Sequence, residues 1–201
     1  MTKTLFGLFD EDLWKIFPVI MSEHQQNWAK IYALEKQLLE KQLGHDKIAR
    51  INHFGSTTVP GLVAKPIIDI LLEIPRDVVI GDLKKKIESI GYICVKSDAN
   101  FVFLKGYTPT GFLGQIFHLH VRPLNDWDEL YFCDYLRKNP KVAEEYDQLK
   151  KILSQKFMHN RDIYSEAKTN FIRKITRLAR INATMDHNNW PTSEQHLPKV
   201  V

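Results

Sequence analysis

The segment HFGSTTVPGLVAKPIID ends in Asp69 and holds residue types that suit the binding of an anionic group. Gly55 lets backbone amides approach an anion closely, and the hydroxyls of Ser56 and Thr57 add further donors. Lys65 adds a positive charge, and Asp69 projects from a predicted strand on the face opposite the apolar one. The same pattern also fits a Gly/Pro turn that enters a core strand with a solvated or salt-bridged aspartate. Both interpretations stay open, because glycine-rich turns alone are weak evidence.

His118 and His120 stand two residues apart on a predicted strand, so their imidazoles point to the same side. Such a pair suits a metal or an anionic substrate, and an ordinary histidine pKa of ~6.5 suits acid/base work near neutral pH. The alternative is a pair of half-buried histidines hydrogen-bonded to their neighbours. We expect both to converge with Asp69 on one cleft, with Gly55 and Ser56 at its rim.

A third cluster, Arg161-x-x-Tyr164-x-x-x-Lys168, precedes a predicted helix near the C-terminus. Tyr164 and Lys168 are one helical turn apart and therefore share a face. Lys168 is a candidate phosphate ligand on this basis. The alternative is a solvated helix edge on which the lysine stem covers the aromatic ring.

Alternating apolar residues predict the strands that would position these groups. They are expected at residues 50–54, 67–74, 92–96, 101–105 and 116–121, with 92–96 and 101–105 as a hairpin-like pair. Residues 55–61 are predicted to form an ordered loop.

Helical signals lie on both sides of these strands along the chain. Ser22 and Gln25 resemble a capping box, and Gly44 provides the stop signal of the helix that follows. Asp82 is expected to cap a short helix that ends at Gly91. Two further apolar stripes occur in the C-terminal half, on Val142, Tyr146, Leu149 and Leu153 and on Phe171, Ile175, Leu178 and Ala179. Strands enclosed by helices at both chain ends indicate an α+β fold.

The composition narrows the class of protein. The chain has 201 residues, of which 44% are apolar and 26% charged, typical of one globular domain. We expect a single domain over residues 1–183 and a loosely held tail over 184–201. A net charge of +4 falls short of a dedicated nucleic-acid binder. The two cysteines lack a metal-binding spacing, and no apolar run approaches the ~18 residues that span a bilayer. The N-terminal residues lack the apolar core of a signal peptide. We therefore expect a cytoplasmic protein that does not enter the membrane.

The string HFGSTTVPGLVAKPIIDILLEI resembles the signature of the GrpB family. Companion segments match in register from about residue 12 to residue 180: EHQQNWAKIYALEK, FHLHV, DYLRKNPKVAEEYDQLKKILSQKF and RDIYSEAKTNFI. The family is similar to the nucleotidyltransferase superfamily, which includes polymerase beta. The resemblance therefore implies a nucleotidyltransferase-like mixed sheet flanked by helices.

In that superfamily a Gly-Ser pair holds the triphosphate, and three carboxylates bind two magnesium ions. Gly55-Ser56 matches the pair, and Asp69 matches the first carboxylate. The second carboxylate would fall at Leu71, and Glu73, roughly 6–7 Å further along the strand, is an imperfect replacement. The strand that would supply the third carries His118 and His120 instead.

The resemblance thus implies a metal-binding and catalytic set of Asp69, His118 and His120 that departs from the magnesium pattern. One carboxylate with two imidazoles suits zinc or manganese better than magnesium, or no metal at all. Candidate phosphate ligands are Gly55, Ser56, Thr57, Lys65 and Lys168.

Two functions follow with equal support. One is transfer of a nucleotidyl or related phosphoryl group, and the other is a catalytically inactive module that binds a nucleotide or phosphorylated small molecule. A partner-binding role for basic residues of the last helix is a third possibility, which a solvated face explains more simply. The oligomeric state stays open.

Overall fold

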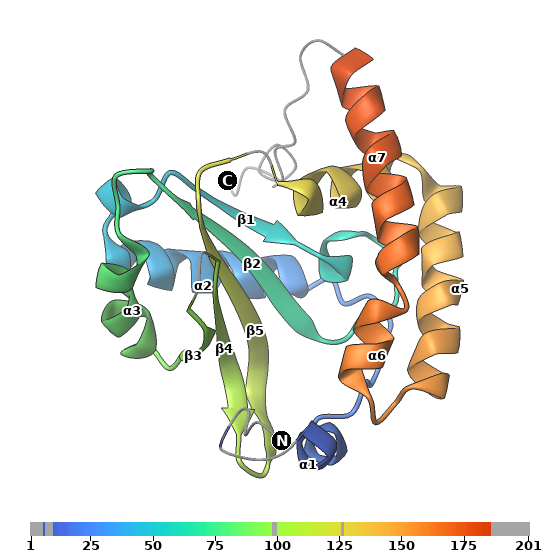
Figure 1. Ribbon diagram of the computed structural model, residues 1–201, viewed down its shortest axis with the longest axis horizontal. Helices are drawn as coiled ribbons and strands as arrows, with labels where there is room; N and C mark the ends of the chain where they lie inside the picture. The colour runs from blue at the N-terminus through green and yellow to red at the C-terminus, as the bar shows by residue number, and fades with distance from the viewer. Residues whose placement is uncertain (1–5, 7–9, 98–99, 126, 186–201) are drawn as a thin grey trace.

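The structure is a computed structural model that describes residue 6 and residues 10–97, 100–125 and 127–185. Its strands form one mixed five-stranded sheet in the order β1-β2-β5-β4-β3 (Figure 1). The strands are β1 (Arg50–Phe54), β2 (Ile67–Ile74), β3 (Ile93–Lys96), β4 (Phe101–Thr108) and β5 (Gly111–Pro123). β2 and β5 run parallel, whereas the other neighbouring pairs are antiparallel.

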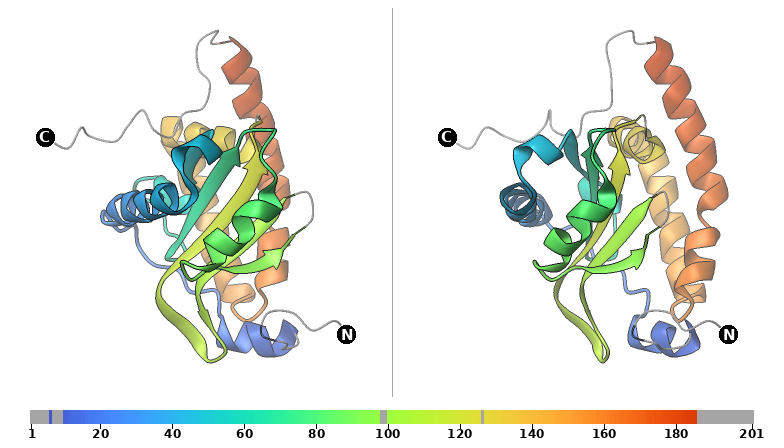
Figure 2. Two further views of the ribbon diagram at one scale, coloured as in Figure 1. Left: turned by 90° about the vertical axis from the view of Figure 1, so that its left-hand side faces the viewer. Right: turned by 60° about the vertical axis from the view of Figure 1, so that its left-hand side comes forward.

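Helices cover both faces of the sheet. They are α1 (Asp10–Ile16), α2 (Trp28–Leu43), α3 (Ile80–Glu88), α4 (Asp128–Lys138), α5 (Pro140–Lys156), α6 (Arg161–Glu166) and α7 (Thr169–Met185), with 3-10 turns η2 (His45–Lys47) and η3 (Ser56–Thr58). α2 and α3 lie on one face, and the C-terminal helices lie on the other (Figure 2). The α+β class with helices from both ends of the chain is therefore confirmed.

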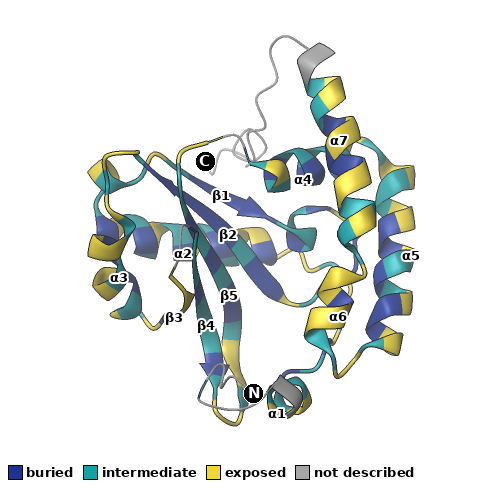
Figure 3. Ribbon diagram, viewed as in Figure 1, coloured by how far each residue is buried: buried dark blue, intermediate teal, exposed yellow. Residues whose placement is uncertain are grey.

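The central strand β2 is buried on both sides (Figure 3). Its even-numbered residues, Ile68 to Ile74, join the core under α2 and α3. On the opposite face Leu71 joins a second apolar cluster with residues of α4, α5 and α7, such as Leu130 and Ile175. Asp69 occupies the same face as Leu71, so the helices that cover this face enclose the aspartate as well.

Two strand predictions match β1 and β2 residue for residue. The predicted pair at 92–96 and 101–105 corresponds to β3 and β4, which are antiparallel neighbours. β4 and β5 both extend further than predicted and meet in a tight turn between Thr108 and Gly111. The missed part contains Gly106, where the register shifts. A Cβ atom there would lie 2.6 Å from the Gln115 carbonyl oxygen, so only glycine fits this bulge.

Both predicted N-caps are wrong. Ser22 does not cap α2, which begins at Trp28, because its hydroxyl and amide both donate to the carbonyl oxygen of Ala64. Asp82 lies inside the first turn of α3, which begins at Ile80. Gly44 does end α2, as predicted, with a φ of +92°.

The C-terminal helices reach past the predicted boundary. α7 continues to Met185, so the expected end of the domain at residue 183 falls inside this helix. Nearly all of the predicted tail, residues 186–201, lies outside the described residues. Among the residues that are described, no helix combines the length and the apolar character needed to cross a bilayer.

Candidate functional site

A cavity of about 890 Å³ lies between the sheet and the C-terminal helices. Its lining comes from β1, η3, β2, β5 and α4 to α7. This volume is in the range of small-molecule sites. All predicted site residues line it: Gly55, Ser56, Thr57, Lys65, Asp69, His118, His120 and Lys168. The prediction that residues distant in sequence share one cleft is thereby confirmed, whereas their roles stay predictions.

Strand β2 carries Asp69 into this site beside its parallel neighbour β5. β2 and β5 run parallel, and their register places Asp69 opposite His118. The Asp69 Oδ1 atom lies 3.3 Å from His118 Nδ1. Burial works to raise the pKa of Asp69, but the His118 contact and the charges of His118, His120 and Lys65 outweigh it and lower the pKa below its usual value. Asp69 is therefore an ionised carboxylate at neutral pH.

Gly55 is required for this placement of Asp69. A Cβ atom at Gly55 would lie 2.6 Å from Asp69 Oδ2, and the backbone there has φ +81° and ψ −175°. Only glycine adopts that conformation routinely. The absence of a side chain at Gly55 thus lets the Asp69 carboxylate lie against the backbone, in addition to the close approach of an anionic ligand that we predicted.

Some of the groups around η3 that were predicted to bind phosphate already have hydrogen-bond partners within the protein. The Gly55 amide donates to the Cys133 sulfur over 3.1 Å, and the Thr57 hydroxyl is buried against His53 Nε2 at 2.9 Å. These two groups already have partners, so the expected cradle of Gly55 amide and Thr57 hydroxyl is not open. Ser56 also lines the cavity, and its side chain is hydrogen-bonded to Tyr146, so it too already has a partner.

His118 has partners at both ring nitrogens. Nδ1 faces Asp69, and Nε2 lies 2.8 Å from the Tyr107 hydroxyl, which in turn accepts a hydrogen bond of 3.1 Å from Arg161. Burial lowers the pKa of His118, although the contact with Asp69 opposes the shift. His118 is therefore hydrogen-bonded rather than available to a new ligand, as the alternative interpretation had it.

His120 is also neutral near pH 7. Its ring packs edge-on against Phe54, with centroids 5.2 Å apart, and its Nδ1 lies 3.5 Å from Arg122 Nη2. Burial lowers its pKa to about 4, while Asp69 works in the opposite direction. Burial thus favours the neutral form of both imidazoles against the effect of the nearby carboxylate, and the acid/base and metal-binding roles of these histidines stay predictions.

The predicted metal ligands do not fit a metal as they stand. Asp69 and His118 engage each other, and His118 has no free nitrogen to coordinate an ion. Over the part of the chain that the structure describes, no three His, Cys, Asp or Glu side chains are grouped to hold a metal. Asp69, His118 and His120 thus share a cavity without forming a three-ligand set.

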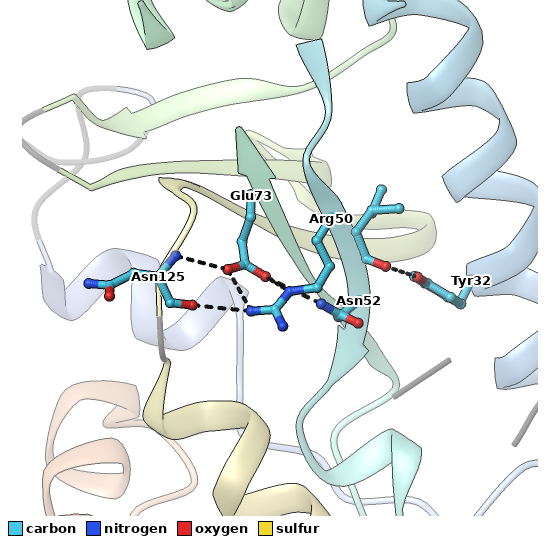
Figure 4. A network of polar contacts seen from close by, with 6 residues as sticks. Tyr32, Arg50, Asn52, Glu73 and Asn125 are labelled. Carbon is cyan, nitrogen blue, oxygen red and sulfur yellow. Dashed lines mark hydrogen bonds and ion pairs between the residues drawn. The ribbon is translucent and has the colours of Figure 1, made fainter. Parts of the chain in front are cut away.

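Glu73 does not replace the missing second carboxylate. Its side chain is fully buried and receives a hydrogen bond of 2.8 Å from Arg50 Nη2 and a second from Arg50 Nε. Asn52 and the Asn125 amide contact the same carboxylate (Figure 4). Leu71, at the position that the superfamily pattern gives to this carboxylate, is buried in the apolar cluster. Asp69 therefore acts without a second strand carboxylate.

Two lysines face one aromatic ring at the Asp69 end of the cavity. The ring of Tyr164 is buried, and the nitrogens of Lys168 and Lys65 lie 4.1 Å and 5.5 Å from its centroid. Within the described residues neither ammonium has a hydrogen bond or an ion pair. The predicted alternative of a solvated helix edge is wrong here, because Tyr164 points into the molecule.

Burial changes the charge of both lysines. Desolvation and then the charges of Arg161 and Lys168 lower the pKa of Lys65 to about 7, against the opposing effect of Asp69. Desolvation lowers the pKa of Lys168 to about 8. A group that binds an anion gains most where its charge lacks a partner, so Lys65 and Lys168 stay candidate anion ligands of the cavity.

Several residues that line the cavity were not predicted from the sequence, and Arg161 was assigned no role. Arg122, Trp127 and Phe132 lie beyond the predicted strand at 116–121 and carry no motif. Tyr107, which contacts His118, falls past the predicted end of its strand because Gly106 interrupts the alternation. Extending that strand through the bulge would have placed Tyr107 near the site.

The fold and site define a class: an α+β protein with a mixed sheet and a lysine-lined cavity against its central parallel strands. Within that class the chain belongs to the GrpB family, whose model, described as GrpB protein, matches residues 18–178. The chain is 35% identical over 167 residues to the glutamate-rich protein GrpB of Alkalihalophilus pseudofirmus, covering 78% of this chain and 93% of that one. It is 34% identical over 182 residues to UPF0157 protein PA4798 of Pseudomonas aeruginosa, covering 89% and 72%. A crystal structure of conserved protein GrpB from Enterococcus faecalis is similar, with a TM-score of 0.72 and 31% identity over 82% of this chain and 99% of that chain.

Proposed function

We propose that the cavity binds a nucleotide or another phosphorylated small molecule, with the phosphate at Lys65 and Lys168. The observation that carries the proposal is a pair of half-buried ammonium groups that have no carboxylate partner among the described residues. Arg161 lines the same end and adds a third positive charge, which Asp69 offsets only in part. A phosphate supplies the negative charge that this end of the cavity lacks.

The opposite end of the cavity suits a neutral ring. Arg122 is paired with Glu129 at 2.7 Å, and Arg180 with Asp128 at 2.6 Å, so these charges cancel. Phe54, Trp127 and Phe132 line the wall beside them, with the Arg122 guanidinium 4.7 Å from the centroid of the Trp127 ring. These apolar residues favour contact with a flat heterocycle.

The distance between the two ends fits a nucleotide. Four residues along β5 separate His118 from Arg122, which corresponds to roughly 13 Å at the rise of an extended strand. A phosphate at the lysine end and a base at the aromatic end would span this length. An isolated phosphate or a short sugar phosphate would leave the aromatic end unfilled.

Nucleotidyl transfer is the second candidate, and the Asp69–His118 pair favours it. The ionised Asp69 would accept the proton of an acceptor hydroxyl, whose oxygen would attack the α-phosphorus of a nucleoside triphosphate. The bond from that phosphorus to the bridging oxygen would break, and pyrophosphate would leave with its charge held by Lys65 and Lys168. The resemblance of Gly55-Ser56 and Asp69 to the Gly-Ser pair and the first carboxylate of the nucleotidyltransferase superfamily supports this candidate. The single strand carboxylate supports the binding function instead.

Replacing either Lys65 or Lys168 with Ala tests the proposal. Each loss of a charge-assisted contact is expected to weaken nucleotide binding by roughly 1.5–3 kcal/mol, with the fold intact. Calorimetric titration with nucleoside mono-, di- and triphosphates, with and without Mg²⁺, Mn²⁺ and Zn²⁺, measures the effect. Lys41→Ala is the matched control, since Lys41 is exposed on α2, on the other face of the sheet.

Wild-type affinity in both cavity variants would show that the lysines are not phosphate ligands. In that case a ligand detected in the parent protein would bind elsewhere. Where a nucleotide does bind, its presence at one hundred times its Kd should stabilise the protein by about 2.7 kcal/mol, which thermal unfolding detects. Labelled triphosphate with candidate acceptors would then separate transfer from binding alone.

A further inference from the structure

Two side chains of α5 hold the backbone of Val63, in the segment between η3 and β2. The Val63 amide donates to Asp147 Oδ1 over 2.7 Å, and its carbonyl oxygen accepts a hydrogen bond from Lys150 Nζ. Val63, Asp147 and Lys150 are all buried. The two side chains stand three residues apart on the helix and therefore face the same segment. The helix thus supplies both of the partners that a neighbouring strand would otherwise give to this backbone.

The next residue, Ala64, is held from the other side. Its amide and its carbonyl oxygen pair with the backbone of Ser22, at 3.0 and 2.8 Å. This alternation is that of an extended chain, in which the backbone groups of successive residues point to opposite sides. The chain is therefore fixed on both sides directly before Lys65.

Lys65 depends on this segment for its place in the cavity. Its side chain reaches the buried ring of Tyr164, with the nitrogen 5.5 Å from the ring centroid. Lys65 and Tyr164 line the cavity, whereas Asp147 and Val63 do not. Asp147 can therefore affect a bound anion in two ways, through its charge and through the backbone that it holds.

We propose that Asp147 is a positioning residue, which together with Lys150 fixes the Val63 backbone and thereby places Lys65 at the anion-binding end of the cavity. The inference rests on the proposed function, because it takes Lys65 as a ligand of the phosphate. The alternative is that these contacts only stabilise the chain before β2. In that case the position of Lys65 does not depend on Asp147.

The charge of Asp147 has to be separated from its hydrogen bond. Asp147 also pairs with Lys151 at 2.8 Å. Burial lowers the pKa of Lys150 to about 7, and the charge of Asp147 works against this shift. Lys150 lines the cavity, so loss of that charge alone affects anion binding. Asp147→Asn and Asp147→Ala both lose the charge, but only Asn keeps an oxygen that can accept from the Val63 amide.

Calorimetric titration with inorganic pyrophosphate therefore compares Asp147→Ala with Asp147→Asn. Complete loss of a charge-assisted contact weakens binding roughly tenfold or more, so a displaced Lys65 should make Asp147→Ala bind roughly three- to tenfold more weakly than Asp147→Asn. Asp147→Leu has nearly the shape of Asn without its acceptor, and it replaces Asp147→Ala if that variant does not fold. Leu39→Ala, in the core on the other face of the sheet, is the control that loses stability without touching Val63, and its affinity should equal that of the parent.

The reactivity of Lys65 measures its placement without any ligand. Acetylation by acetic anhydride over a range of pH, followed by mass spectrometry of the peptide that contains Lys65, gives the pKa of this amine, because only the neutral form reacts. Burial, and then the charges of Arg161 and Lys168, lower that pKa to about 7 in the parent. It should stay there in Asp147→Asn and in Leu39→Ala. In Asp147→Ala it should rise towards the ordinary lysine value of about 10.4, because a displaced Lys65 regains contact with water.

The two measurements fail in different ways. Equal pyrophosphate affinities in Asp147→Ala and Asp147→Asn, or equal Lys65 profiles, would overturn the proposal. If pyrophosphate does not bind even the parent protein, the proposed function fails, and the Lys65 profiles alone decide whether Asp147 places this side chain.

Discussion

Gly55→Ala is expected to lower the free energy of unfolding by roughly 2–4 kcal/mol. The backbone conformation at Gly55, φ +81° and ψ −175°, costs a residue with a Cβ atom roughly 1–3 kcal/mol. The new methyl group would also lie 2.6 Å from Asp69 Oδ2, so the carboxylate must move and its contact with His118 is lost. The contact between His118 and the Asp69 carboxylate is long, at 3.3 Å, so we assign it roughly 0.5–1.5 kcal/mol, which makes up the rest.

Denaturation by urea, followed by circular dichroism, measures this loss. In thermal unfolding it corresponds to a decrease in Tm of roughly 4–16 °C for a domain of this size. Gly61→Ala is the control, because Gly61 also has a positive φ, +76°, but a Cβ atom there meets nothing within 4 Å. Gly61→Ala should cost only the backbone strain and should leave nucleotide affinity unchanged.

A double-mutant cycle isolates the steric part. In an Asp69→Ala background the 2.6 Å approach to the carboxylate oxygen disappears and a 3.3 Å contact with the Cβ atom remains, so adding Gly55→Ala should cost about 1 kcal/mol less than in the parent protein. Equal costs in the two backgrounds would mean that Asp69 does not lie against Gly55. The close approach on which the site geometry depends would then be refuted.

Two further predictions concern charge. Nucleotide affinity should fall as pH rises through the pKa values of about 7 and about 8 of Lys65 and Lys168, because the bound phosphate favours their protonated forms. Binding at pH 8 should accordingly take up protons, seen calorimetrically as a dependence of the enthalpy on the buffer, and no such dependence would exclude these lysines. Arg50→Ala should destabilise the protein by roughly 3–5 kcal/mol, because it leaves Glu73 buried and unpaired. Affinity should stay within twofold of the parent, and a larger loss would show that Glu73 belongs to the site after all.

Strands β1 and β2, at one side of the sheet, could be predicted because their residues alternate and their ends are marked. β1 and β2 were assigned residue for residue on this basis. The first residues of β5, Gly111 to Gln115, carry no alternation, and the Gly106 bulge breaks the pattern of β4. Their pairing comes from the hairpin between them, a contact that short-range periodicity does not encode.

The predicted N-cap at Ser22 is wrong because of another long-range contact. Ser22 has the residue type and spacing of a capping box, but its hydroxyl and amide bind the carbonyl oxygen of Ala64, 42 residues away. Local side-chain propensity and long-range pairing compete for the same donor, and here the long-range pairing prevails. Nothing in the local sequence reports the position of Ala64.

The candidate site shows where residue spacing stops being informative. Two-residue spacing correctly placed His118 and His120 on the face of Asp69, because strand geometry alone decides the direction of a side chain. It could not give their charge, which depends on burial by the helices that follow later in the chain, from α4 to α7. Burial lowers the pKa of the histidines and of the cavity lysines alike, and it brings the pKa of Lys65 and Lys168 to about 7 and about 8. A strand pattern therefore indicates which residue types face a site, whereas their protonation near neutral pH depends on the enclosing helices, which remove water from both kinds of side chain.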